Sequence, residues 1–214
     1  MRHYILKSSL VLLAVISVTS CKKDLLESTP FGQSTSASFW RNADDAIAAS
    51  NALYSFIGDE YMFAHTEQTW DICSDDQWRA GDHPEDQAIE EFTYEPSNPQ
   101  LNDSWARKYE VISRANAVLI NVPNITMDES LKTRILGEAH FIRGLMYWYF
   151  YRIYGQVPII KEENVTSNNY NVPKGTLDEM YAIIESDFKA AADALPLQND
   201  EANLGRATKG SAWG

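Results

Sequence analysis

Apolar side chains recur at helical spacing along much of the chain, and the pattern is densest between residues 126 and 155. One stripe advances in steps of three and four and consists of Leu131, Ile135, Glu138, Ile142, Leu145, Tyr149 and Ile153. Other faces of the same segment carry Phe141, Met146, Trp148, Phe150 and Tyr154. A helix that is apolar nearly all round must be covered on several sides, so this segment is predicted to be the central helix of an α-helical domain.

The two ends of this central helix carry recognisable signals. Thr126 is predicted to cap its start, because Glu129 stands three residues later and can bond back to the cap. Gly155 and then Pro158 are predicted to end it, since proline cannot continue a helix.

Three further helices are predicted from the same kind of periodicity. The first begins after a cap at Asn42 and ends at Gly58, and the second runs from about residue 104 to residue 121. The third begins at Thr176, where Glu179 completes a capping box. Helices in succession, joined by turns and one long irregular loop, predict an all-α fold of stacked helical hairpins.

The long loop covers residues 59–103, where no helical pattern lasts. It is rich in acids and holds three prolines and the aromatic residues Tyr61, Phe63, Trp70, Trp78, Phe92 and Tyr94. A loop of this length inside a domain is uncommon and is usually functional. The alternative is that its aromatic side chains only fasten a long excursion onto the helices, and the sequence leaves both interpretations open.

The first 37 residues are not predicted to belong to the helical domain, which we place at residues 38–214. Residues 1–20 combine a basic start with a short apolar run and read as a lipoprotein signal peptide. Cys21 follows small residues, as in a bacterial lipobox, and is predicted to become the acylated N-terminus of a polar tether over residues 21–37. The alternative is an ordinary secretory signal in which this cysteine is incidental.

Charge and cysteine content narrow the possible partners. The formal net charge is −12, and it becomes −14 without residues 1–20, which carry two basic residues and no acid. Such a chain repels nucleic acid and anionic membrane surfaces, so we expect no nucleic-acid partner. With Cys21 acylated, no disulfide framework is expected, and Cys73 is predicted to be a half-buried thiol.

No catalytic, metal or cofactor motif stands out. The histidines are scattered without metal-ligand spacing. The adjacent acids Asp75-Asp76 and Glu90-Glu91 could be proposed as glycosidase carboxylates, but that chemistry needs two carboxyl groups facing each other across a sugar. A calcium site built from Asp71, Asp75 and Asp76 lacks the glycine and glutamate spacing of an EF-hand.

The long loop does offer the residue types that a sugar site needs. A pyranose presents a C–H face that stacks on a flat aromatic ring, and hydroxyls that planar polar side chains can bind. Trp70, Asp75, Gln77, Trp78 and Arg79 supply that mixture within ten residues. They are our predicted ligand-binding residues.

Three polar residues on the helical stripes are predicted to be structural instead. Glu138 and Arg143 are five apart on the central helix, so they do not share a face and do not form a catalytic pair. Asn116 lies on an apolar stripe of the preceding helix and needs a partner if buried. Glu138 is predicted to accept a hydrogen bond from a buried donor such as Asn116.

These features together resemble the RagB/SusD family of nutrient-binding outer-membrane lipoproteins. The resemblance is carried by Cys21 with its tether, Phe39-Trp40 with Asp44-Asp45-Ala46, Trp105 with Tyr109 and Ile112, Ala115-Asn116, Gly137-Glu138-Ala139-His140-Phe141-Ile142-Arg143-Gly144 running into Tyr154-Gly155-Gln156-Val157-Pro158, Glu179-Met180-Tyr181, Ala194-Leu195-Pro196 and Gly205-Arg206-Ala207-Thr208-Lys209-Gly210. Ile142 and Gly144 depart from the residues usual in that family, as changes at packing positions.

The resemblance implies a tetratricopeptide-like fold, a cell-surface location at the outer membrane and a lipid anchor. It also implies an oligosaccharide or peptide ligand, no enzymatic activity and no cofactor, and a TonB-dependent (SusC-like) transporter barrel as partner. Chains of that family continue well beyond the segment at residues 205–210, so we expect this sequence to be the N-terminal portion of such a protein. Thr208 then looks like the cap of a helix that the sequence does not contain.

Two other function classes remain open at this point. One is a helical-repeat interaction scaffold without a small ligand, which predicts that the loop aromatics are buried. The other is an acid-pair glycoside hydrolase, which predicts turnover that depends on a loop carboxylate.

Overall fold

The helix predicted at the centre of the domain is α7, which runs from Glu129 to Tyr154. The structure is a computed structural model that describes residues 39–59, 62, 71–78, 81 and 83–214. Residues 40–214 form one unit, and within it α7 packs against helices on several sides. The predicted central role of this helix is confirmed.

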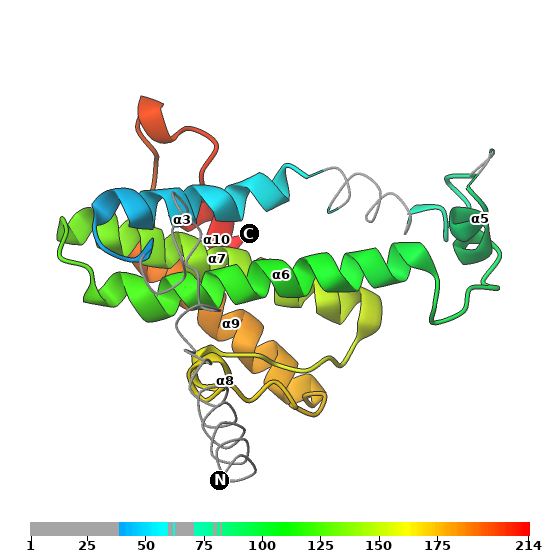
Figure 1. Cartoon of the computed structure of the whole chain (residues 1–214). Helices are drawn as coiled ribbons and strands as arrows, with labels where there is room; N and C mark the ends of the chain where they lie inside the picture. Colours follow the sequence, from blue (N-terminus) through cyan, green and yellow to red (C-terminus); the bar gives the residue numbers. More distant parts are fainter. Residues whose placement is uncertain (1–38, 60–61, 63–70, 79–80, 82) are drawn as a thin grey trace, which may run out of the picture. The chain divides into compact units, whose positions relative to one another are not determined.

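The described residues fold into helices joined by turns (Figure 1). The helices are α3 (Ala43–Ile57), α5 (Pro84–Glu90), α6 (Pro99–Asn121), α7, α8 (Glu162–Thr166), α9 (Leu177–Ala194) and α10 (Lys209–Trp213), with the 3-10 turns η2 (Val122–Asn124) and η3 (Glu201–Asn203). Extended pairing in this part of the chain is limited to one isolated bridge between Pro158 and Lys174. The predicted all-α class is confirmed. No helix among the described residues has the length and apolar content needed to cross a membrane.

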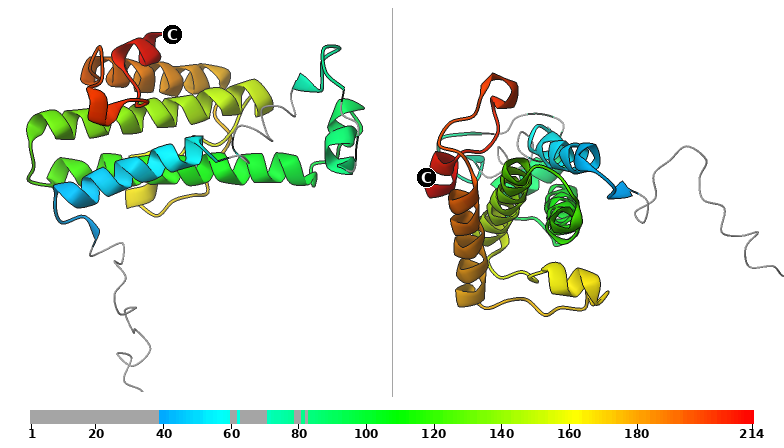
Figure 2. Two further views of the ribbon diagram at one scale, coloured as in Figure 1. Left: turned by 90° about the horizontal axis from the view of Figure 1, so that it is seen from above. Right: turned by 90° about the vertical axis from the view of Figure 1, so that its left-hand side faces the viewer.

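Consecutive long helices form antiparallel hairpins. In the α6–α7 hairpin, the Tyr154 hydroxyl at the end of α7 donates to the Leu101 carbonyl near the start of α6, at 2.8 Å. The rings of Tyr109 and Phe150 meet further along, with centroids 4.6 Å apart. Figure 2 shows α6 and α7 side by side, with α3 packed along both. The predicted stacked hairpins are confirmed.

Helix α9 runs antiparallel to α7 and approaches it closely because two glycines of α7 face it. A Cβ on Gly137 would lie 2.8 Å from the Ala194 Cβ, and one on Gly144 would lie 3.0 Å from the Asp187 Cβ. The two glycines are seven residues apart, which is about two helical turns, so they share one face. Larger side chains at these positions would separate the two helices.

The core lies around α7 and is closed by α3, α6 and α9. Its fully buried members include Leu53, Val111, Ile112, Ile142, Met146, Tyr147, Phe150 and Met180. Each buried aliphatic or aromatic side chain of this size contributes about 1.5–3 kcal/mol relative to its exposed state. This burial explains why the apolar residues of α7 cover most of its circumference.

The caps of α3 and α9 are those predicted, whereas the cap of α7 is not. The side chain of Asn42 accepts from the Asp45 N–H, and Thr176 forms the expected box with Glu179. The predicted cap at Thr126 is wrong, since α7 begins after Asp128, whose carboxylate accepts from the Leu131 N–H at 2.8 Å. A carboxylate at this position also favours the positive end of the helix dipole.

Two helix starts were missed because each coincides with a proline. Helix α6 begins at Pro99, about five residues earlier than predicted, after Asn98 accepts from the Gln100 N–H. Helix α5 begins at Pro84 inside the predicted long loop. Proline is favourable at the first helical position, where its missing N–H would have no intrahelical partner.

The segment after α9 also departs from the prediction. Thr208 does cap a helix, because α10 follows it from Lys209 to Trp213. The side chain of Thr208 accepts from the Ser211 N–H at 3.2 Å.

Candidate functional site

The turn at residues 71–78 carries the predicted sugar-binding residues that the structure describes. Asp75, Gln77 and Trp78 are all exposed, and Trp78 has 75% of its surface accessible. Trp70 and Arg79 lie outside the described residues. The turn therefore exposes the Trp78 ring, the Asp75 carboxylate and the Gln77 amide to solvent, and their role in sugar binding stays a prediction.

The base of this turn contacts α5 through Cys73. Ile72 is buried, and the Cys73 thiol lies 3.8 Å from the Ile89 carbonyl. The Ser74 hydroxyl donates to the Asp71 carbonyl at 2.6 Å and closes the turn. Partial burial raises the pKa of Cys73, which makes this thiol a poor nucleophile. The turn is thus held at its base while Trp78 extends into solvent.

Two further aromatic residues of the predicted loop are exposed after the end of α5. Phe92 is 68% accessible and adopts a positive φ of 55°, and Tyr94 is also exposed. A positive φ is uncommon for a bulky residue and marks the tight reversal that follows α5. The described loop aromatics are therefore not packed into the core, contrary to what the scaffold alternative predicts.

The acids of this region do not assemble a metal site in the part of the chain that the structure describes. No group of three or more potential ligands is gathered there, and this includes Asp71, Asp75 and Asp76. Asp75, Asp76 and Glu91 are exposed.

The polar residues predicted to be structural are all buried, and Arg143 is the hub of one network. Its guanidinium forms a bidentate pair with Asp187 of α9, both bonds at 2.8 Å. It also donates to the Asn116 side-chain oxygen at 2.6 Å and pairs with Glu162 of α8 at 3.0 Å. Burial by itself lowers the pKa of Arg143, but the bonds and charges of Asp187 and Glu162 outweigh it and raise the pKa further. This one side chain ties α6, α7, α8 and α9 together.

Glu138 belongs to a separate network, so the expected hydrogen bond from Asn116 is wrong. The fully buried Glu138 carboxylate accepts from the hydroxyl of Ser50 on α3. It also pairs with Arg134 at 3.2 Å and with Arg206 at 3.0 Å. It thereby connects α3 and α7 to the segment before α10. Sequence periodicity placed Glu138 on a buried face but held no information on which distant residues meet it.

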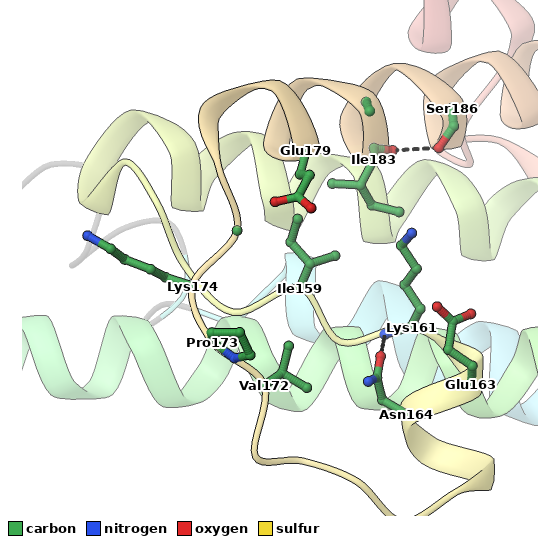
Figure 3. Close-up of a pocket in the computed structure, with 12 residues that line it drawn as sticks. Ile159, Lys161, Glu163, Asn164, Val172, Pro173, Lys174, Glu179, Ile183 and Ser186 are labelled. Carbon is green, nitrogen blue, oxygen red and sulfur yellow. Dashed lines mark hydrogen bonds between the residues drawn. The ribbon is translucent and has the colours of Figure 1, made fainter.

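Sequence reasoning did not identify a groove between the connector at residues 157–175 and α9. It encloses about 530 Å³, which lies within the range of small-ligand pockets. Its lining is Ile159, Lys161, Glu163, Asn164, Val172, Pro173, Lys174, Gly175, Glu179, Ala182, Ile183 and Ser186. Figure 3 shows the side chains of Ile159 and Lys161 on one wall facing Glu179 and Ile183 of α9.

The connector wall of this groove is fixed by side chains from α6 and α7. The Tyr109 hydroxyl donates to the Pro158 carbonyl at 2.7 Å, and the Asn116 amide donates to the Ile160 carbonyl at 3.0 Å. The Tyr147 hydroxyl accepts from the Ile160 N–H at 2.8 Å and donates to the Ile160 carbonyl at 3.0 Å. Burial raises the pKa of both tyrosines, so the hydroxyls stay protonated as donors.

The returning strand of the connector is fixed by a glycine. The Gly175 N–H donates to the Val157 carbonyl at 2.9 Å, beside the bridge between Pro158 and Lys174. A Cβ on Gly175 would lie 2.7 Å from the Ile159 Cδ1, so a larger residue here would displace the Ile159 side chain that lines the groove. Both sides of the connector are thus held in place before any ligand arrives.

The sequence of this chain matches a family model over residues 41–214. The family is described as SusD-like, starch-binding and associated with the outer membrane. Among curated proteins, the chain is 26% identical to a SusD-like protein of Bacteroides ovatus, over 98% of this chain and 38% of that protein. It is 25% identical to the starch-binding protein SusD of Bacteroides thetaiotaomicron, over 96% of this chain and 39% of that protein. The chain thus spans less than half the length of these relatives.

Solved structures show the same likeness. A laminarin-binding SusD-like protein superposes with a TM-score of 0.72 and 28% sequence identity, over 80% of this chain and 38% of that one. A SusD-like protein from Bacteroides fragilis superposes with a TM-score of 0.68 and 26% identity, over 82% of this chain and 34% of that one. The arrangement of helices described above is therefore that of tetratricopeptide-like SusD folds.

Proposed function

The chain belongs to the SusD-like family, and on that premise we propose that it is a surface lipoprotein that captures a nutrient oligosaccharide. In this proposal Cys21 carries the lipid anchor at the outer membrane, and the bound glycan passes to a TonB-dependent transporter barrel. The protein binds its ligand without cleaving it and uses no cofactor.

The observation that supports glycan capture best is the exposure of Trp78 on an anchored turn. A large aromatic side chain that is 75% accessible leaves its ring open to contact with a ligand, and an aromatic ring suits the C–H face of a pyranose. Asp75 and Gln77 stand beside it in the chain and offer acceptors and donors for sugar hydroxyls. We assign the ligand-binding role to this turn, with Trp70 and Arg79 as its neighbours in sequence.

Calorimetry with Trp78→Ala tests this assignment. The probes are malto- and laminari-oligosaccharides, chosen because relatives of this chain bind starch or laminarin. Loss of a central aromatic contact is expected to weaken binding at least about tenfold, equivalent to about 1.4 kcal/mol. The matched control is Trp213→Ala, which removes the same side chain from a position that is 72% exposed on α10.

The outcomes separate the alternatives. Equal affinities for Trp78→Ala and Trp213→Ala remove Trp78 from the site. Binding of no oligosaccharide by the wild-type chain contradicts the proposed function and favours a helical interaction scaffold. Release of shorter sugars during the titration favours a glycoside hydrolase instead.

A further inference from the structure

We propose that the groove between the connector at residues 157–175 and α9 is a second saccharide site, distinct from the Trp78 turn, and that it takes a short neutral oligosaccharide. This inference rests on the proposed glycan-binding function and adds a location and a ligand class to it.

The groove is preorganised by polar groups of the α6–α7 hairpin that hold its connector wall. Residues 158–160 receive hydrogen bonds from Tyr109, Asn116 and Tyr147, all from the α6–α7 hairpin. Arg143 pairs with Glu162 and so fixes α8, which carries groove residues. A wall held in this way loses little conformational freedom when a ligand binds, and that favours affinity.

The floor of the groove is apolar and its rim is polar. Ile159 and Ile183 face each other across the groove in Figure 3, with Pro173 and Val172 at one end. A surface of this kind suits the C–H face of a pyranose. It also removes water from the ligand, which strengthens the hydrogen bonds made at the rim.

The rim holds the planar polar groups that bind vicinal hydroxyls. Glu163 and Glu179 contribute carboxylates, Asn164 an amide, and Lys161 an ammonium group. The Thr176 N–H and hydroxyl both donate to the Oε2 atom of Glu179, whose carboxylate lines the groove. The Asn164 side-chain oxygen accepts from the Lys161 N–H, which leaves its amide hydrogens to donate to a ligand.

The charges of the groove select against an acidic ligand. Two carboxylates and the Lys161 ammonium point into it, whereas Lys174 extends away in Figure 3. The whole chain carries a net charge of −12, which opposes the approach of any polyanion. Neutral sugar hydroxyls can donate to the carboxylates and accept from Lys161 without a buried charge being left unpaired.

The test uses the full chain and maps binding by amide chemical-shift changes on titration with maltotriose and laminaritriose. A trigalacturonate and a glucosamine trimer serve as the acidic and the basic probe. We expect shifts at the Asn164, Gly175 and Ser186 amides with at least one neutral trisaccharide, and we expect these shifts to persist in Trp78→Ala.

Groove-filling variants give the decisive comparison. Ala182→Trp places an indole in the groove from an exposed position of α9 and is expected to weaken the groove affinity at least about tenfold. The control Lys189→Trp adds the same side chain to an exposed position of α9 that does not line the groove, and it should bind normally. If Ala182→Trp fails to fold, Glu163→Ala removes a rim carboxylate from the exposed face of α8 and should weaken binding about fivefold.

Each outcome decides the proposal. Shifts confined to the Trp78 turn, with Ala182→Trp binding as tightly as the wild type, overturn the groove site and leave the proposed function intact. Binding of only the acidic or only the basic probe in the groove overturns the neutral ligand class. An absence of shifts with every saccharide overturns this inference together with the proposed function.

Discussion

Two buried carboxylates, Glu138 and Asp187, are held by arginines and join helices that are distant in sequence. Asp187 receives both arms of the Arg143 guanidinium, and Glu138 lies between Arg134 and Arg206. Ion pairs of this kind add little net stability compared with apolar packing, because burying the charges is costly. Removing one partner is a different matter, since the remaining charge stays buried without compensation.

Truncation of Glu138 should therefore be severe. Glu138→Ala leaves the two arginines facing each other and leaves the Ser50 hydroxyl without its acceptor, so we expect a loss of about 3–5 kcal/mol in the free energy of unfolding. Urea unfolding followed by circular dichroism measures this loss. The control is Glu110→Ala, which breaks an exposed pair with Arg114 and should cost at most about 1 kcal/mol.

A more conservative variant, Glu138→Gln, tests whether Glu138 is structural or functional. At a temperature where it is still folded, Glu138→Gln should bind oligosaccharide as the wild type does, because the carboxylate does not reach the surface. A loss of affinity without a loss of stability would contradict the structural role assigned here.

At the scale of the helix, the sequence predicted the first residue of some helices and missed that of others, depending on the residues at each start. The starts at Asn42 and Thr176 could be predicted because the capping side chain bonds to the backbone a few residues away. At α7 the sequence offered two polar candidates, and the cap is Asp128 and not the predicted Thr126. Starts at Pro84 and Pro99 were missed, because proline signals both a loop and a first helical turn. Local sequence alone does not separate these two uses.

Local sequence predicts the candidate sites even less completely than it predicts the helix starts. The residues of the Trp78 turn could be named as candidates because they lie close together in the chain and their types suit sugar binding, and that role stays a prediction. The groove could not, because its walls come from the connector and α9 and are positioned by Tyr109, Asn116 and Tyr147 on other helices. Such contacts join residues more than forty positions apart in two of these three cases, and no local pattern encodes them.

The capping box of α9 gives a prediction for pH dependence. The Thr176 N–H and hydroxyl donate to Glu179 at 2.7 and 2.9 Å, and these bonds hold the pKa of Glu179 below its usual value. A carboxyl group with a depressed folded-state pKa stabilises the fold at a pH above its unfolded-state pKa, and this contribution disappears as the pH falls through the folded-state value.

Glu179→Gln should therefore lower the melting temperature at about pH 7, and the difference from wild type should be smaller at about pH 3, which lies below the usual carboxyl pKa of about 4.3. Thermal unfolding at both pH values measures this, with Glu185→Gln as a control for loss of an exposed carboxylate on the same helix. A difference that is constant with pH would mean that the Glu179 charge does not stabilise the cap.

At the scale of the whole molecule, capture of a nutrient glycan depends on where the helical unit is held. The family match begins at residue 41, directly after the predicted tether of residues 21–37. Neither the tether nor Cys21 is among the described residues. Both proposed sugar sites lie on the unit that the tether would keep at the cell surface, so under the proposed function the anchor would keep bound glycan near the transporter.

Replacing Cys21 by serine tests this arrangement in intact cells. Serine lacks the thiol that carries the first lipid, so the variant would not receive the two or more acyl chains that anchor a lipoprotein stably. Each methylene of such a chain that is buried in the membrane contributes about 0.8 kcal/mol to binding. The wild-type protein is expected in the detergent phase of an outer-membrane extract, and Cys21→Ser is expected to leave it. Cys73→Ser removes the other thiol of the chain and should remain anchored.

Equal partitioning of wild type and Cys21→Ser into the detergent phase would contradict the lipid anchor and favour an ordinary secretory signal. The folded unit would then have to reach the membrane through its protein partner alone.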